Sequence, residues 1–491
     1  MERNVIKNKE DNFLQWYWNV KFAQIQNKIS RIRDLKLGIM EILMIVVFVL
    51  GYLMIALEHK IHIDKAPTAL ITGMICWAIY SFFLADVSES ADVAHHVLAH
   101  GNSGNAGLYH HMYDIANILL FLLGAMTIVE TIDEHHGFKI ITNKIRTTNK
   151  VKLLWTIAIL SFFFSALLDN LTTAIVMISL LRKLVSDKQT RWLFAGVVVI
   201  AANAGGAWSV IGDVTTTMLW IGGQLKDPIG IAIPSLIIPS FIALLVPLLI
   251  LSFTLKGEVN RPEEDDTNGN KFETTRGEKI TLLTVGVLGL LFVPIFKTVT
   301  HLPPFTGMML SLGIVWTLTE IMHRKKESTH KRHLSVISVL RKVDTSSVLF
   351  FLGILLAVAA LQEIGHLDIM ANWLQDTLQN NYAINMSIGF LSSIVDNVPL
   401  VAAAQGMYKP QMAEAIASAA ELNDFFPNGT FWEFLALCAG TGGSCLIIGS
   451  AAGVAVMGLE KIDFIWYLKK ISLLAIVGYV AGAATYILLV A

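Results

Sequence analysis

The sequence predicts an all-α, polytopic membrane protein. Of its 491 residues, 54% are hydrophobic and only 15% are charged, and the mean hydropathy of +0.60 is well above that of ordinary water-soluble domains. Several apolar runs are about 20 residues long, enough for a helix to cross roughly 30 Å of hydrocarbon. Cys76, Cys438 and Cys445 each lie within an apolar run, so neither a disulfide framework nor a zinc site is expected.

The predicted elements begin with an interfacial segment, residues 1–36, which mixes aromatic residues with Lys and Arg as helices on a membrane surface do. Apolar runs then predict spanning helices over residues 37–57, 67–85, 114–131, 229–256, 278–297, 304–322, 346–365 and 464–490. The charged stretch 257–277 predicts a flexible linker. It divides the chain into a first half, 37–256, and a second half, 278–491.

Two regions, 151–187 and 383–419, each consist of two apolar arms that look too short to cross singly, which predicts a re-entrant hairpin in each. Both are interrupted by the pattern Ser-x-x-x-Asp-Asn, at 165–170 and 392–397. Matching blocks precede them (121–126 and 350–355) and follow them (204–212 and 441–449). Three matched blocks in the same order indicate an internal duplication.

The blocks that follow the hairpins lie in apolar segments 191–224 and 431–458. Paired glycines near the middle of each segment predict a broken transmembrane helix, because glycine permits unusual backbone conformations and close approach of another chain segment.

Loop charges predict opposite orientations for the two hairpins. Basic side chains flank the first hairpin: Lys144, Arg146, Lys150, Lys152, Arg182, Lys183, Lys188 and Arg191. By the positive-inside rule, its ends belong in the cytoplasm. Mainly acidic side chains flank the second, which should enter from outside: Asp368, Asp376, Glu421 and Asp424. Inverted repeats with interrupted helices near the bilayer midplane are typical of secondary transporters.

Each interrupted region carries polar residues at membrane depth, including an acid in three of them: Asp169, Asp213 and Asp396. An ionised carboxylate in hydrocarbon costs about 2.5 to 3.5 kcal/mol even on a lenient scale, so such acids normally serve an ion path or a partner. Neutral oxygen donors accompany them: Asn170, Thr172, Thr173, Asn203, Thr215, Thr216, Asn397, Thr441 and Ser444. Carboxylate and neutral oxygens suit a hard monovalent cation.

Structural alternatives for these residues remain open. Asp169 or Asn170 could cap the second hairpin arm, and Gly205 and Gly206 with the threonines could serve helix packing. No Lys or Arg is evident at the depth of the three acids. Because burial and like charge favour the protonated carboxyl, we expect a proton and a cation to compete for the acids, which would produce exchange.

From about residue 114 onward, the chain resembles the NhaD-type sodium/proton antiporters of the ion transporter superfamily, in "ILLFLLGAMTIVETIDEHHGF", "SALLDNLTTAIVM", "GGAWSVIGDVTTTM" and "SSIVDNVPLVAA". The resemblance implies export of Na⁺, and often Li⁺, in exchange for H⁺ by an elevator-type movement of a transport domain against a scaffold. It also implies a homodimer in the plasma (inner) membrane, and no cofactor. It adds Ser165 and Ser392 to the site and implies Na⁺ binding at Asp169, Asn170, Asp213 and Asn397.

A histidine-rich segment precedes the third predicted span, in a loop expected outside the membrane. Its members are His95, His96, His100, His110 and His111. A solvated loop, a pH-responsive element and a zinc site through His96 and His100 are its three possible roles. Residues 130–136, which contain further acids and histidines, are expected to form a solvated helix end or a proton sensor.

Two other functions are compatible with part of the sequence. A sodium-coupled carboxylate transporter, or another anion carrier, could use the same scaffold, although an anion site should not be lined by three acids. An intramembrane aspartyl protease would also pair aspartates, but Val210 interrupts the Gly-x-Gly-Asp pattern before Asp213. The sequence therefore favours a cation transporter over an enzyme, and nucleic acid is not an expected partner.

Overall fold

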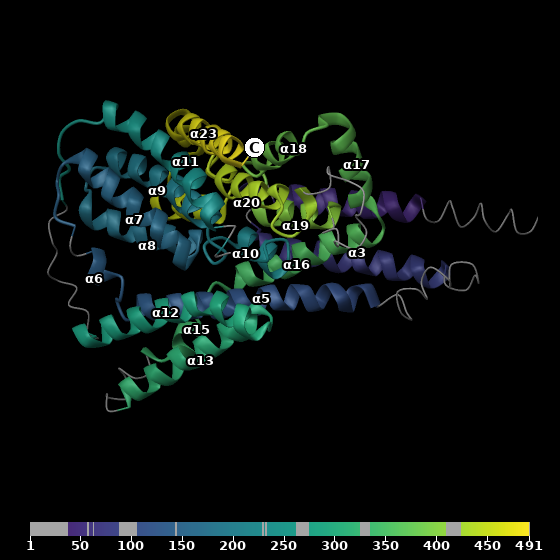
Figure 1. Ribbon diagram of the computed structural model, residues 1–491, viewed down its shortest axis with the longest axis horizontal. Coiled ribbons are helices and arrows are strands. Elements are labelled where there is room, and N and C mark those ends of the chain that lie inside the picture. Colours follow the sequence, from purple (N-terminus) through teal and green to yellow (C-terminus); the bar gives the residue numbers. More distant parts are fainter. Residues whose placement is uncertain are drawn as a thin grey trace, which may run out of the picture.

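The computed structural model describes residues 38–55, 58–61, 63–87, 106–142, 145–227, 230, 233–261, 274–324, 334–408 and 424–490. These residues form helices joined by short loops and contain no strand, only an isolated bridge between Asn149 and Glu258 (Figure 1). Within this part of the chain, nine helices are long and apolar enough to cross a membrane. The prediction of an all-α polytopic membrane protein is confirmed.

Long continuous helices cover the predicted spans, and shorter helices lie between them. In the first half they are Gly38–Ile55, α2 (Glu58–Ile61), α3 (Lys65–Val87), α5 (Ala106–Glu134), α6 (Lys139–Thr142) and α11 (Ile233–Thr254). In the second half they are α12 (Arg276–Thr300), α13 (Pro304–His323), α15 (Val336–Leu340), α16 (Thr345–Glu363), α17 (His366–Leu378), α22 (Phe464–Tyr467), a π-helical turn (Leu468–Ser472) and α23 (Leu473–Val490).

Four helices are interrupted at the polar motifs. In the first half, α7 (Lys150–Leu168) is followed at once by α8 (Asn170–Leu184), and α9 (Lys188–Ala207) is separated from α10 (Val214–Ile221) by a loop. In the second half the equivalents are α18 (Asn381–Leu391) with α19 (Asn397–Met407), and α20 (Thr430–Gly442) with α21 (Ala451–Glu460). The prediction that every hairpin arm is too short to cross is wrong for α7, whose 19 residues are long and apolar enough.

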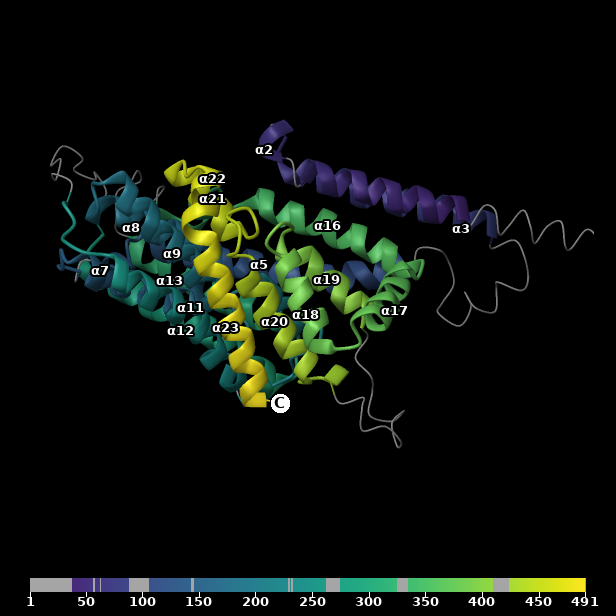
Figure 2. The ribbon, with the colours of Figure 1, turned by 90° about the horizontal axis from the view of Figure 1, so that it is seen from above.

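The interrupted helices pack against each other reciprocally. Within each half, α7 packs on α9 and α18 packs on α20; between the halves, α8 packs on α21 and α19 packs on α10. The helices α11 and α23 pack side by side along this core, while α5, α12 and α13 lie on its other side (Figures 1 and 2). A further close pair, α3 and α16, contacts the core through α5 and α19.

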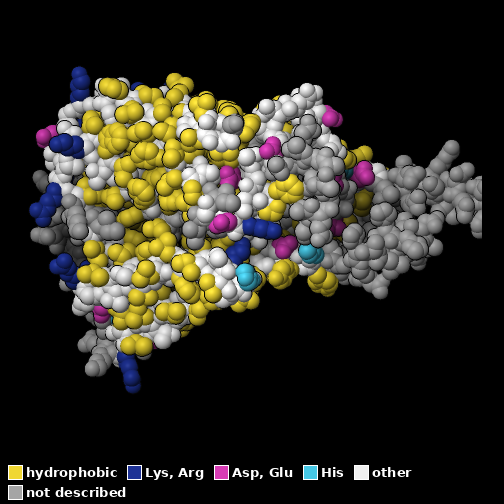
Figure 3. Space-filling model, viewed as in Figure 1, with side chains coloured by type: hydrophobic (Ala, Val, Ile, Leu, Met, Phe, Trp, Pro, Cys, Tyr) yellow, Lys and Arg dark blue, Asp and Glu magenta, His cyan; other side chains and the backbone are white. Residues whose placement is uncertain are grey.

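Charge is distributed unevenly along the long axis. Lys and Arg side chains gather at one end of the molecule, at the left of Figure 3, next to a broad hydrophobic band. This basic end contains the start of α7, the end of α8 and the start of α9 (Figure 1). There, buried Glu460 of α21 accepts hydrogen bonds at 2.7 Å from Arg182 and from Arg191, which ties the two halves together.

Some sequence predictions fall outside the described residues: the interfacial segment 1–36, His95, His96 and His100, linker residues 262–273 and residues 409–419 of the second hairpin. Two others are corrected. His110 and His111 lie in the first turns of α5, not in a loop. His135 is fully buried and stacks on His323 of α13, so the end of α5 is not simply solvated, because α13 covers it.

Candidate functional site

Asp213 lies at the centre of a buried polar network. Its carboxylate accepts hydrogen bonds from the amide of Asn170 at 3.2 Å and from the amide of Asn397 at 3.2 and 3.5 Å. The Asn170 amide also donates to the side-chain oxygen of Asn203 at 3.1 Å. Asp213 is 1% exposed. Side chains from both halves of the chain therefore meet at one carboxylate.

Helix N-termini surround this carboxylate. Asn170 is the first residue of α8 and Asn397 the first of α19, while Asp213 itself caps α10 by accepting the backbone N–H of Thr215. The N-terminus of a helix carries partial positive charge. Three such ends therefore contribute partial positive charge near the buried Asp213 carboxylate.

Asn203 links the network to the fourth interrupted helix. Its amide nitrogen donates to Ser444 at 3.0 Å and to Ser450 at 2.9 Å. Ser450 caps α21, as Asp213 caps α10. Both broken helices thus have a capping side chain at the same position, but only the cap of α10 is charged.

Asp169 occupies a strained backbone position at the junction of α7 and α8. Its φ of 82° and ψ of 159° lie in a region that side-chain-bearing residues rarely adopt. Its carboxylate accepts the backbone N–H of Thr172 at 2.7 Å and the Thr172 hydroxyl at 2.9 Å. The capping alternative is therefore present in the structure, for Asp169 as for Asp213. Capping alone does not require strain, which is frequent at functional sites.

Asp396 behaves differently, because it makes an ion pair. The ammonium of Lys65, the first residue of α3, lies 3.2 Å from Asp396 Oδ2, and the Asp396 side chain does not cap α19. The expectation that no Lys or Arg lies at the depth of the three acids is wrong. Lys65 was missed because it precedes its predicted span and comes from the opposite end of the sequence.

Several predicted residues serve the framework of the site. Ser165 donates to the carbonyl of Ala202 at 2.5 Å, and Ser392 donates to that of Ala439 at 2.9 Å, so each hairpin serine bonds to the broken helix of its own half. Thr441 bonds back to Leu437 in its own helix. The other predicted threonines are buried, and they lie close to Asp169 or Asp213 in the sequence: Thr173, Thr215 and Thr216.

Glycines allow the backbones of the interrupted segments to contact each other. A Cβ atom at Gly206 would press on the carbonyl of Gly212, and one at Gly443 on that of Gly449. Likewise, a Cβ at Gly205 would collide with the Phe162 carbonyl and one at Gly442 with that of Gly389. Backbone-to-backbone packing at these positions places the breaks of all four helices together.

A cavity lies between the end of α5 and the first turns of α8. It has a volume of about 460 Å³ and is bordered by Glu130 and Asp133 near the end of α5, by Asp344, and by Thr172. A smaller cavity of about 40 Å³ borders Asp169 and Asn170 directly. The two cavities share Lys65, Met126, Leu171, Ser347 and Ala451. The wide cavity therefore adjoins the small one that borders Asp169.

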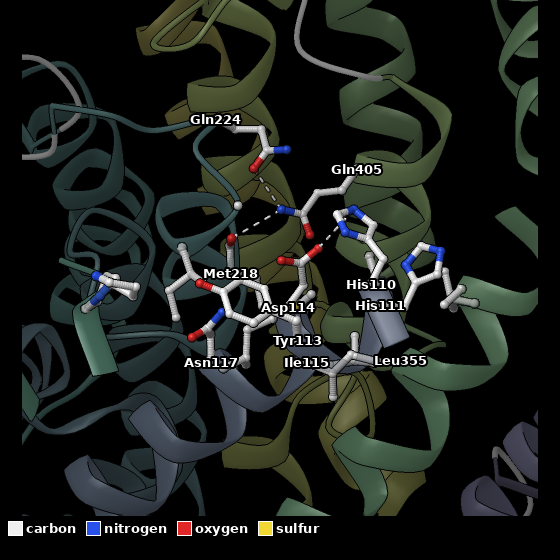
Figure 4. Close-up of a pocket in the computed structure, with 18 of the residues that line it drawn as sticks. His110, His111, Tyr113, Asp114, Ile115, Asn117, Met218, Gln224, Leu355 and Gln405 are labelled. Carbon is white, nitrogen blue, oxygen red and sulfur yellow. Dashed lines mark hydrogen bonds and ion pairs between the residues drawn. The ribbon is translucent and has the colours of Figure 1, made fainter. Parts of the chain in front are cut away.

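A second large cavity, of about 410 Å³, opens near the beginning of α5 (Figure 4). Its polar lining includes His110, His111, Asp114 and Lys297. On its inner side, the amides of Gln405 (α19) and Gln224 lie 2.8 Å apart, and Gln405 donates to the carbonyl of Met218 at 3.2 Å. Met218 lies five residues beyond Asp213, about 7 Å along α10. The buried network thus separates two polar cavities that approach from different ends.

Comparison with known proteins finds membrane transporters. The family model described as "Citrate transporter" (CitMHS) matches residues 39–422. "Sodium/proton antiporter 1" of Arabidopsis thaliana is 43% identical over 450 residues, covering 91% of this chain and 72% of the relative. "Sodium/proton antiporter 2" of the same plant is 40% identical, covering 90% and 98%. The "Na(+)/H(+) antiporter NhaD" of Vibrio cholerae is 30% identical, covering 91% of each chain.

Proposed function

Because the chain belongs to the NhaD-type sodium/proton antiporters, we propose that it exports Na⁺, and also Li⁺, in exchange for entering H⁺. It is a secondary transporter and not an enzyme. The observation that carries the proposal is the buried Asp213 carboxylate, which receives Asn170 and Asn397 from the two halves of the chain.

The cation is coordinated by Asp169, Asn170, Asp213 and Asn397. In this structure the amide nitrogens of Asn170 and Asn397 face the Asp213 carboxylate. Turning either amide about its last bond presents an oxygen instead, which is the ligand that Na⁺ requires. A proton on Asp169 or Asp213 removes the negative charge that attracts the cation, so the two ions compete for one site.

Alternating access follows from movement of the interrupted helices as a unit. We assign α7–α10 and α18–α21 to the transport domain and helices such as α5, α12 and α13 to the scaffold. The reciprocal packing of α8 on α21 and of α19 on α10 supports inverted repeats with opposed hairpins. The cavity between Asp169 and the basic end supports a cytoplasm-facing state, since basic loops remain inside. The proposal includes a homodimer in the plasma membrane.

An anion carrier is the second candidate, because the matching family model is described as a citrate transporter. A citrate site needs several positive groups to balance its carboxylates. The network around Asp213 has helix N-termini but also a carboxyl group at its centre, and Lys65 is already paired with Asp396. The charge of the site therefore favours a cation.

Purified protein in proteoliposomes tests the proposal. With a proton-sensitive dye inside, addition of Na⁺ or Li⁺ should cause proton movement, whereas K⁺ should not, under a clamped membrane potential. Uptake of labelled citrate in the presence of Na⁺ is the parallel assay. Citrate uptake without cation-driven proton movement would overturn the assignment.

A further inference from the structure

The ion pair between Lys65 and Asp396 joins two separate parts of the molecule. Lys65 begins α3, and Asp396 lies at the break between α18 and α19. Their side chains are 19% and 14% exposed, so both charges are largely removed from solvent. Each charge in such surroundings is stabilised by the other, because neither is well hydrated.

The position of Lys65 is set by α3 and α16. Its ammonium lies 4.4 Å from the centre of the Phe350 ring, and Phe350 of α16 is fully buried. The helices α3 and α16 pack along each other over their length (Figure 2). The lysine is thus a fixed point outside the four interrupted helices.

Asp396 connects Lys65 to the centre of the site. Asp169 and Asp213 each accept a backbone N–H of the helix that follows them, whereas Asp396 caps no N–H of α19 and turns to Lys65. The next residue, Asn397, donates to both carboxylate oxygens of Asp213. A displacement of Asp396 therefore moves, one peptide unit away, an amide that holds Asp213.

Lys65 also lies where three cavities meet. It borders the cavity beside Asp169, the wide cavity that opens at the basic end, and a third cavity of about 50 Å³ beside Asp396 and Ser450. Glu58 and Asp344 interact with it electrostatically as well. Among the described residues, no Lys or Arg makes an ion pair with Asp169 or Asp213. Lys65 is paired with Asp396, the third acid.

We propose that Lys65 is a positioning residue of the antiporter: its ammonium neutralises Asp396, ties the second hairpin to α3 and α16, and holds Asn397 against Asp213. Asp396 then serves as the counter-charge of Lys65 and is not a cation ligand, which leaves Asp169 and Asp213 to bind the cation and the proton. The inference rests on the proposed function, since it specifies which acids of that site exchange ions.

Replacing one member of the pair should affect transport more than replacing both. Removing one partner of a shielded ion pair leaves the other charge without its nearest counter-charge, whereas removing both leaves two neutral groups of similar shape. Lys65→Gln and Asp396→Asn should each slow Na⁺/H⁺ exchange by about tenfold or more. The double variant should return to within about threefold of the unaltered protein, and its KM for Na⁺ should stay within about twofold. Lys65→Arg should retain most of the rate.

Lys188 provides a matched control, because its ammonium also lies over an aromatic ring, 4.7 Å from the centre of Trp192, but outside the site. Lys188→Gln should exchange ions at the rate of the unaltered protein. The variants are compared in proteoliposomes across a range of Na⁺ concentrations. The unfolding midpoint of each is measured in detergent, where the single variants should fall and the double variant recover.

Two results would overturn the inference. If Asp396→Asn and the double variant both raised the KM for Na⁺ tenfold, Asp396 would be a ligand; if Lys65→Gln left the rate unchanged, the pair would have no positioning role. The unfolding midpoints separate this inference from the proposed function. If the unaltered protein exchanged no ions, the proposed function would fail, while recovery of the midpoint would still establish the ion pair.

Discussion

Asp213 illustrates, at the scale of single residues, how a carboxylate combines two roles. It caps α10 through the backbone N–H of Thr215, and it accepts amides from Asn170 and Asn397. Asparagine caps helices about as well as aspartate. A change from Asp to Asn therefore removes the charge but keeps the cap, which separates structure from function.

Asp213→Asn should reduce Na⁺-driven proton movement by about a hundredfold or more, because the exchanged charge is lost while the remaining oxygen keeps the cap. Its new amide nitrogen requires the amides of Asn170 and Asn397 to turn their oxygens toward it. The measurement is the initial rate in proteoliposomes, with the unfolding midpoint as a check on folding.

Asp187 is the matched control, since it caps α9 through the backbone N–H of Thr190 but lies in a loop at the basic end. The hydrogen bonds from Thr190 lower the pKa of Asp187, so this cap is charged throughout the neutral range and would weaken only as pH falls toward that lowered pKa. Asp187→Asn should leave exchange unchanged. Equal losses in both variants would show that Asp213 acts only as a cap.

At the scale of elements, each interrupted helix pair depends on glycine where it crosses its neighbour. Gly205 of α9 meets the backbone of α7 at Phe162, and Gly442 of α20 meets the backbone of α18 at Gly389. The same contact occurs in both halves of the chain. These glycines let two helices approach until the polar breaks of all four lie within hydrogen-bond reach.

Gly205→Ala should destabilise the protein by about 1 to 3 kcal/mol, because the added methyl group must displace the backbone at Phe162. Gly458 in α21 is the control: nothing lies within 4 Å of a Cβ atom there. Gly458→Ala should be neutral or stabilise the helix by up to about 1 kcal/mol. Unfolding midpoints in detergent measure both changes, and equal midpoints for the two variants would refute the close crossing.

At the scale of the whole molecule, the buried network separates two cavities that open in different directions. Glu130 and Asp133 border the one near the end of α5, and His110 and His111 border the one near its beginning. The lining of the first shares residues with the small cavity that borders Asp169. Access to Asp169 from the basic end is therefore expected.

A cysteine at Ser347, which borders both the small and the wide cavity, should react with a membrane-impermeant maleimide added on the side of the basic loops. Added Na⁺ should slow the reaction by occupying or moving the adjacent site. Background labelling should be low, because Cys76, Cys438 and Cys445 are buried.

A cysteine at His301, in the other large cavity, serves as the control and should react from the opposite side. Labelling of Ser347→Cys from the same side as His301→Cys would contradict the assigned access. The comparison needs oriented vesicles, in which each side of the membrane can be exposed to the reagent separately.

The sequence by itself determined the fold class, the positions of the helix breaks and the presence of acids within apolar segments. These features follow from properties local to the chain: the length of apolar runs, the backbone freedom of glycine and the cost of a charge in lipid. The repeated Ser-x-x-x-Asp-Asn motif also located Asn170 and Asn397, although not their shared partner.

Only the tertiary structure decided which polar groups meet. Asn397 reaches Asp213 because α19 packs on α10 of the other half, and Asn170 reaches it because α8 packs on α9. Lys65 pairs with Asp396 across 331 residues of sequence. Such partners are set by the packing of helices distant along the chain, whereas hydropathy and motif spacing report only on neighbours. The sequence therefore supplied the charges, and the packing determined that Asp396 pairs with Lys65 while Asp169 and Asp213 do not pair with it.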